Sequence, residues 1–214
     1  MASSWGKHLK ISIWGESHSE SIGVIVDGLP AGQKIDWEQV LAFMGRRRSS
    51  GAATDTARKE ADIPEIQSGL LNGRTCGTPI CALIRNNNTQ SKDYSLFERI
   101  ARPGHADYSG FLRYDGYNDI RGGGHFSGRL TAPLCIAGGM CIKWLEEMGI
   151  RIGARIVSIG GIHDDDQLDP VNPDLSKIRT DFPVLSVSAA EAMCNAISRA
   201  KERGDSVGGI IECY

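Results

Sequence analysis

LCIAGGMCIKWLEEMG, residues 134–149, is the stretch around which the rest of the chain is expected to fold. Small and apolar residues recur along it at helical spacing, and Gly149 closes it, which predicts a helix. The residues of this stripe are Leu134, Gly138, Cys141, Leu145 and Met148. Ala137, Gly138 and Gly139 remove side-chain bulk in mid-helix at a cost in helix propensity. We therefore expect a central helix that packs closely against another backbone.

Alternating apolar residues predict strands on both sides of this helix. The expected strands are residues 9–13, 22–26, 63–66, 78–84, 150–156 and 207–213. Further helices are expected from Asp36, with Gln39 as its capping partner, and over residues 95–100 and 188–204. This order favours an α+β architecture with antiparallel sheets over a doubly wound parallel sheet. No linker or low-complexity tract divides residues 1–214, which predicts a single domain, with two tightly packed halves as the alternative.

Composition narrows the functional classes. The chain has 214 residues, 41% of them hydrophobic, and a net charge of −2, so no overall charge favours nucleic acid or an anionic membrane. No apolar run approaches the length of a membrane span, and the first ten residues lack the apolar core of a signal peptide, which predicts a cytoplasmic protein. The six cysteines show no CxxC spacing and lie in apolar runs, so we expect buried thiols rather than a metal or redox site.

RPGHADYSGFLRYDGYNDIRGGGHFSGR, residues 102–129, has the composition of a binding site. Two histidines and four arginines stand among glycines, with little apolar periodicity. Such a segment cannot stabilise itself by burying one face, so we expect it to be held by its surroundings and used for binding. The alternative is a long polar connection with solvated charges.

The glycine run Gly122 to Gly124 lies at the entrance to the predicted central helix, with Ser127 and Arg129 just after it. Backbone amides at a helix N-terminus, reached through glycines, suit an anion or a phosphate. The spacing is neither a Walker loop nor GxGxxG. A glycine-rich turn with Ser127 as the helix cap explains the same residues without a ligand.

His18 and His105 are a candidate pair of acids or bases. His18 follows the first strand, which ends at Gly15, and a strand end fixes the backbone from which such a side chain projects. The alternative is a capped turn with a solvated histidine. The run Arg46 to Arg48 places successive side chains about 100° apart on a helix, so at most one or two can face a common ligand. Plain capping of the helix C-terminus explains this run equally well.

Seven blocks of sequence, in order, resemble the chorismate synthase family. They are GESHSESIGVIVDGLPAG (15–32), RRR (46–48), RKEAD (58–62), SGLLNGRTCGTPI (68–80), RPGHAD (102–107), DIRGGGHFSGRLTA (119–132) and GDSVGGI (204–210). Together they cover essentially the whole chain. The resemblance implies helices sandwiched between two antiparallel sheets and assembly as a homotetramer.

The resemblance also implies the activity. Members of this family eliminate phosphate and a ring hydrogen from 5-enolpyruvylshikimate 3-phosphate to give chorismate. They need reduced FMN although no net redox change occurs, and NADPH is a candidate reductant.

By position, the resemblance assigns roles to individual residues. The catalytic pair would be His18, as an acid near the substrate, and His105, which serves the reduced flavin. Cofactor contacts would come from His125, Phe126, Ser127 and Arg47, and substrate contacts from Ser17, Arg48, Arg102 and Arg129. Several guanidinium groups suit a substrate with one phosphate and two carboxylates.

Three residue-level departures and one of length accompany the resemblance. Ser19 stands where the family commonly has glycine, and GGGHFSGR replaces the common GGGRSSAR. In the loop after RRR, Ala53 stands where the family has a further arginine, which weakens the expectation of nicotinamide nucleotide binding. Family members continue for well over a hundred residues beyond GDSVGGI, so the chain resembles the N-terminal portion of the enzyme. Two hypotheses follow: an enzyme, or the N-terminal portion of one, and a non-catalytic fragment that folds or assembles and binds anions without turnover.

Overall fold

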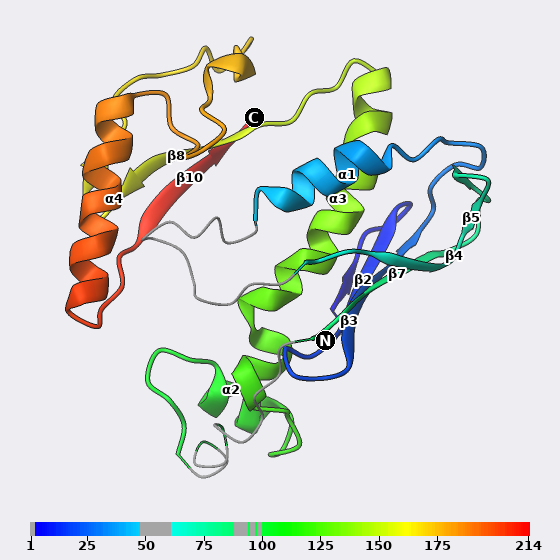
Figure 1. The fold of residues 1–214 in the computed structure, drawn as a ribbon, viewed down its shortest axis with the longest axis horizontal. Coiled ribbons are helices and arrows are strands. Elements are labelled where there is room, and N and C mark those ends of the chain that lie inside the picture. The colour runs from blue at the N-terminus through cyan, green and yellow to red at the C-terminus, as the bar shows by residue number, and fades with distance from the viewer. Residues whose placement is uncertain (1–2, 48–60, 88–93, 95–96, 98–99) are drawn as a thin grey trace. The chain divides into compact units, whose positions relative to one another are not determined.

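The structure is a computed structural model that describes residues 3–47, 61–87, 94, 97 and 100–214. These residues form two compact units (Figure 1), of which the first holds the described residues up to Trp144 and the second holds residues 145–214. The single domain over residues 1–214 stays a prediction. Ser95 and Glu98, the capping residues of the helix expected over 95–100, lie outside the described residues.

The first unit is built on a five-stranded sheet. In spatial order its strands are β1 (Ser4–Trp5), β2 (Lys10–Gly15), β3 (Ser21–Asp27), β7 (Ile80–Arg85) and β4 (Glu65–Ser68). Every neighbouring pair is antiparallel. Strands β2 and β3 form the predicted hairpin, with Ile13 opposite Val24. The α+β class with antiparallel sheets is therefore confirmed.

The core of this unit lies between the sheet and two helices, α1 (Trp37–Gly45) and α3 (Thr131–Glu147) (Figure 1). Alternation explains the sheet side of this core. Ile22, Val24 and Val26 are fully buried, whereas Ile25 between them is 39% exposed. Helix α1 begins as predicted, because the Asp36 carboxylate accepts a hydrogen bond from the Gln39 amide at 3.1 Å.

Close packing of α3 explains its mid-helix glycines. A Cβ atom on Gly139 would lie 3.1 Å from the Cα atom of Val40 in α1. The expected close approach of two backbones is therefore confirmed. The buried face of α3 differs from the predicted stripe, since it consists of Ala132, Pro133, Ile136, Ala137, Gly139 and Met140, while Met148 is 51% exposed.

Three short elements of this unit were not expected from the sequence. They are strand β1, the hairpin of β5 (Leu70–Leu71) and β6 (Arg74–Thr75), and helix α2 (Asp107–Arg113), which lies inside the stretch 102–129. Part of the stretch expected to lack its own structure is thus helical.

The second unit holds a three-stranded antiparallel sheet, β10 (Gly209–Cys213), β8 (Ala154–Ile159) and β9 (Ile162–His163), beside helix α4 (Val187–Glu202) (Figure 1). Ile156 of β8 packs on Ala190 and Met193 of α4. The strand expected over 150–156 begins later than predicted, because pairing with β10 starts at Ala154.

Two further expectations concern the cysteines and the membrane. The described cysteines are free thiols, as expected, but the prediction that all are buried is wrong because Cys76 and Cys213 are exposed. Within the described residues, no helix combines the length and the apolar character that crossing a membrane requires.

Candidate functional site

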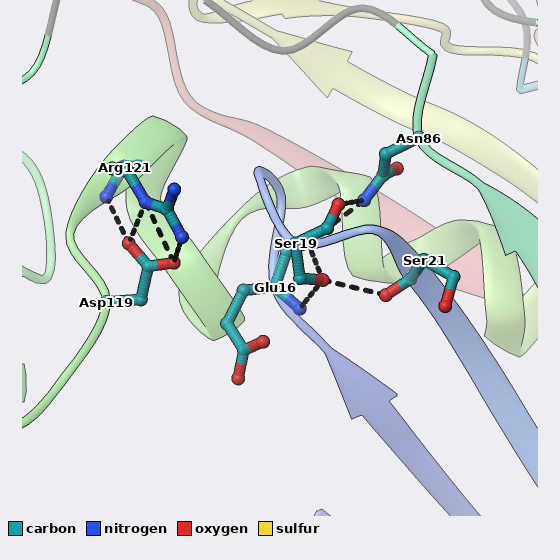
Figure 2. A network of polar contacts seen from close by, with 6 residues as sticks. All are labelled: Glu16, Ser19, Ser21, Asn86, Asp119 and Arg121. Atoms are coloured by element: carbon teal, nitrogen blue, oxygen red, sulfur yellow. Dashed lines mark hydrogen bonds and ion pairs between the residues drawn. The ribbon is translucent and has the colours of Figure 1, made fainter. Parts of the chain in front are cut away.

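The turn between β2 and β3 carries Ser17 and His18 and is held by the side chain of Ser19. The Ser19 hydroxyl lies 2.9 Å from the carbonyl oxygen of Glu16 and 2.7 Å from that of Ser21. It also accepts a hydrogen bond from the Glu16 amide at 3.0 Å. Figure 2 shows this hydroxyl directed into the turn. The serine that replaces the common family glycine therefore stabilises its own turn.

Asn86, the residue after β7, closes the same turn from the other side (Figure 2). Its side-chain nitrogen donates to the carbonyl oxygens of Glu16 at 3.1 Å and Ser19 at 2.9 Å. Its side-chain oxygen accepts from Nε of Arg129 at 3.3 Å. Asn86 thus connects the turn that carries His18 with one of the predicted substrate-binding arginines.

His18 is buried beneath the glycine run. Its side chain is 9% exposed, and its ring meets the ring of Tyr94 edge to face at a centroid distance of 4.9 Å. A Cβ atom on Gly122 would lie 2.3 Å from Nδ1 of His18. Ser17 is 1% exposed, and its amide donates to the carbonyl of Gly124 at 3.1 Å. The alternative of a solvated histidine in this turn is therefore wrong for His18.

The glycine run forms a turn of its own rather than the first turn of α3. Gly122, Gly123 and Gly124 have φ angles of 60°, 87° and 55°, in the left-handed region that a right-handed helix cannot continue. A short 3-10 segment, Gly128–Leu130, separates this turn from α3. The expectation that these glycines sit at the entrance to α3 and offer its N-terminal amides is therefore corrected.

Ser127 caps the 3-10 segment, since its hydroxyl accepts from the Arg129 amide at 3.2 Å. The predicted capping role of Ser127 is confirmed one short segment before α3 begins.

His125 is fixed through both ring nitrogens. Its Nδ1 donates to the carbonyl oxygen of Gly15 at 2.8 Å, and its Nε2 lies 2.5 Å from the hydroxyl of Ser3. Phe126 is 45% exposed and faces Tyr114 at a centroid distance of 6.1 Å. Both His125 and Phe126 line a cavity of about 230 Å³. The structure thus brings two of the four predicted cofactor contacts, His125 and Phe126, to one cavity.

Two predicted anion-binding arginines meet at one carboxylate. Asp62 pairs with Nη1 of Arg47 at 2.5 Å through one oxygen and with Nη1 of Arg129 through the other. The side chains of Asp62 and Arg129 are 2% and 5% exposed, and that of Arg47 is 23% exposed. One carboxylate therefore bridges two guanidinium groups, each through its own oxygen. Arg48 lies outside the described residues.

Arg102 is also paired within the chain. Its Nε and Nη2 each lie 2.8 Å from an oxygen of Asp107, and Nη2 also donates to the carbonyl of Ile120 at 3.2 Å. This hydrogen-bonded guanidinium lowers the pKa of Asp107 against the opposing effect of burial. Arg102 therefore ties the first residue of α2 to the segment that precedes the glycine turn.

His105 is exposed on the turn after Arg102, and its amide donates to the Arg102 carbonyl at 3.3 Å. The two predicted catalytic histidines therefore have different environments, one buried and one open to solvent.

A larger cavity of about 600 Å³ lies beside the Arg102–Asp107 pair. Phe97, Tyr108 and Phe111 contribute apolar walls, and Asn118 and Arg121 contribute polar groups. The side-chain oxygen of Asn118 is buried and has no hydrogen-bond partner in the described part of the chain. Flat apolar walls with a free acceptor fit a planar heteroaromatic ring that carries N–H groups, which is the chemistry of a flavin.

Sequence reasoning missed two residues that organise this region. Asp62 was noted only as the end of RKEAD, and Asn86 was not singled out. Asp62 has a φ of 49°, which is uncommon for a residue other than glycine. No sequence signal pairs Asp62 with arginines that lie 15 and 67 residues away.

The sequence model of the chorismate synthase family matches residues 9–214. The chain belongs to the chorismate synthase family. The chorismate synthase of Dehalococcoides mccartyi is 39% identical over 219 residues, which cover 100% of this chain and 58% of that protein. The chorismate synthase of Thermococcus kodakarensis is 42% identical over 208 residues, which cover 97% of this chain and 57% of that protein.

A crystal structure of a chorismate synthase superposes with a TM-score of 0.72 at 28% identity, covering 97% of this chain and 57% of that one. The family expected from the sequence is therefore confirmed. The chain spans somewhat more than half the length of the chorismate synthases it matches, as the partial resemblance predicted.

Proposed function

We propose that the chain acts as a chorismate synthase, a carbon–oxygen lyase that eliminates phosphate from 5-enolpyruvylshikimate 3-phosphate. In this reaction the ring C–O bond to phosphate and one ring C–H bond break, the hydrogen is lost overall as a proton, and the electron pair of the C–H bond enters a new carbon–carbon double bond. Phosphate leaves with the electron pair of the C–O bond. The observation that carries the proposal is the cluster of Arg47, Asp62 and Arg129, which Asn86 links to the turn of His18 in a chain of this family.

The two guanidinium groups of that cluster support a role in binding the phosphate or a carboxylate of the substrate. Arg102 and Arg48, which follows Arg47 in the sequence, would supply further guanidinium groups. Ser17 would add a polar contact from the His18 turn. His18 would hold a proton near the substrate, in a buried position where water is excluded. His105, which is exposed, would face the flavin.

The residues of the chain fit a flavin. His125 and Phe126 line the smaller cavity, and Asn118 lines both this cavity and the larger one. Ser127 and Arg47 would complete the contacts with the cofactor. Reduced FMN, when bound, would supply an electron-rich ring beside the substrate, and NADPH would be the source of its electrons. We further propose that the protein works as a cytoplasmic homotetramer.

Release of phosphate tests this proposal. The chain is incubated without oxygen with 5-enolpyruvylshikimate 3-phosphate and reduced FMN, and phosphate and chorismate are measured together. We expect equal amounts of both products, and none with oxidised FMN. No release above background, while the Dehalococcoides mccartyi enzyme is active in the same buffer, would favour the non-catalytic alternative.

Two variants, each with one histidine replaced by alanine, test the assignment of His18. Replacing His18 with alanine should lower turnover by about a hundredfold or more, the range typical of a lost general acid. His8, which is exposed in the same unit, is the matched control, and His8→Ala should keep the rate of the unaltered chain. Equal rates for the two variants would remove His18 from the mechanism.

A further inference from the structure

We propose that Asn86 is a positioning residue, which holds the turn of His18 and the guanidinium of Arg129 in one fixed geometry. This inference rests on the proposed function. The side chain of Asn86 uses both of its N–H groups on the turn, at Glu16 and Ser19, and its oxygen on Arg129. Its backbone amide adds a fourth hydrogen bond, to the carbonyl of Glu20 at 3.0 Å.

The partners of Asn86 define which way its amide points. The nitrogen faces two carbonyl oxygens, which can only accept, and the oxygen faces a guanidinium, which can only donate. The reversed amide would bring oxygen against oxygen and N–H against N–H. An aspartate at this position would place a negative charge against the two carbonyl oxygens. Only an amide of this length satisfies all three partners.

Arg129 is fixed by two neighbours at different nitrogens. Asn86 accepts from Nε, while Asp62 pairs with Nη1. Two contacts on a planar group determine both its position and its rotation. Asp62 pairs with Arg129 and Arg47, and Asn86 links Arg129 to the turn of His18. The acid and the anion-binding group of the proposed reaction are thereby placed relative to each other.

The turn keeps other bonds when Asn86 is altered. The Ser19 hydroxyl still bridges Glu16 and Ser21, and the Ser17 amide still donates to Gly124. The variant chain should therefore fold, with a turn that opens more often. A loss of catalytic geometry without loss of fold is what distinguishes positioning from general stabilisation.

Amide hydrogen exchange tests the inference without depending on activity. Asn86→Asp should speed exchange at the Ser17 and Ser19 amides about tenfold or more, since opening of the turn becomes easier. Asn87 is the matched control, because it is the next residue and is exposed, so Asn87→Asp should leave both rates unchanged. Unchanged exchange in Asn86→Asp would overturn the inference, whether or not the chain shows turnover.

Kinetics test the link to Arg129. Asn86→Ala, which removes the contacts without adding charge, is the second variant if Asn86→Asp fails to fold. It should lower kcat/KM by about tenfold to a hundredfold, the effect of a small misplacement, with an unchanged circular dichroism spectrum.

Arg129→Lys keeps the charge and loses the Nε donor, so the double variant should be no worse than the more impaired single one. If the fold-loss of kcat/KM in the double variant equals the product of the two single losses, Asn86 and Arg129 act independently and the link is overturned. A wild-type chain without turnover would contradict the proposed function alone, and the exchange rates would still decide the role of Asn86.

Discussion

Replacing Asp62 with asparagine should make the first compact unit unfold much more easily. The new side chain could accept a hydrogen bond from one arginine, but its amide nitrogen would face the guanidinium of the other. Arg47, which is 23% exposed, can turn toward solvent, whereas Arg129 is 5% exposed and would lose its ion pair with Asp62 while it stays buried. Removing one partner of a buried ion pair costs about 3–5 kcal/mol. The partial hydrogen bond and the freedom of Arg47 to reach solvent place this variant near the lower end of that range, at about 3 kcal/mol.

Urea denaturation followed by tryptophan fluorescence measures this loss. All four tryptophans, at positions 5, 14, 37 and 144, lie in the first unit, so their signal reports its unfolding. With a denaturant dependence of about 2 kcal/mol per molar urea, a loss of about 3 kcal/mol lowers the midpoint by roughly 1.5 M.

Glu65→Gln provides the control for the same exchange of a carboxylate for an amide. Glu65 pairs with Arg85 at 3.3 Å, but the two side chains are 44% and 54% exposed. A pair this exposed contributes below about 1 kcal/mol, so its midpoint should move by less than roughly 0.5 M. If Asp62→Asn shifts the midpoint no more than Glu65→Gln does, the buried double ion pair does not stabilise the unit and our reasoning is refuted.

Two further changes test the glycine turn and the pair at the start of α2. Gly122→Ala should destabilise the first unit by more than the roughly 1–2 kcal/mol of a left-handed alanine, because its Cβ would also meet the His18 ring at 2.3 Å. Gly32→Ala is the control, because Gly32 has a φ of 84° and an added Cβ would meet nothing within 4 Å, so it should show the backbone cost alone. If urea denaturation gives the two variants equal losses of unfolding free energy, the contact with His18 is contradicted. For the second change, Arg102 lowers the pKa of Asp107 in the folded chain, so this carboxylate stabilises the fold above the unfolded pKa of about 3.9 and loses that effect as the pH falls. The difference in unfolding free energy between the unaltered chain and Asp107→Asn should therefore be largest near neutral pH and shrink below about pH 4. A difference that grows toward acid pH would show that folding raises the pKa of Asp107 instead of lowering it.

Local patterns in the sequence revealed most of the regular structure. The β2–β3 hairpin and α1 were predictable because alternation and the Asp36 cap act between near neighbours. Helix α2 was missed because its buried residues are Asp107 and Gly110 rather than an apolar stripe. Strands of two residues, such as β5 and β6, are too short to show a period.

The site shows the same division between local and distant contacts. His18 and the glycine run could be singled out because their composition is unusual within a few residues. The meeting of Arg47, Asp62 and Arg129 could not, since it depends on where β4, α1 and the start of α3 place distant parts of the chain. The family resemblance marked the arginines, but only the structure shows the carboxylate and Asn86 between them.

The sharing of one carboxylate by two guanidinium groups also restricts how this protein can evolve. Exchanging Asp62 with either arginine would leave the remaining arginine facing a like charge, so the usual compensating swap of an ion pair is not open to it. A change of charge at one of the three positions therefore calls for changes at the other two. We therefore expect Arg47, Asp62 and Arg129 to be retained or lost together, as a single heritable unit.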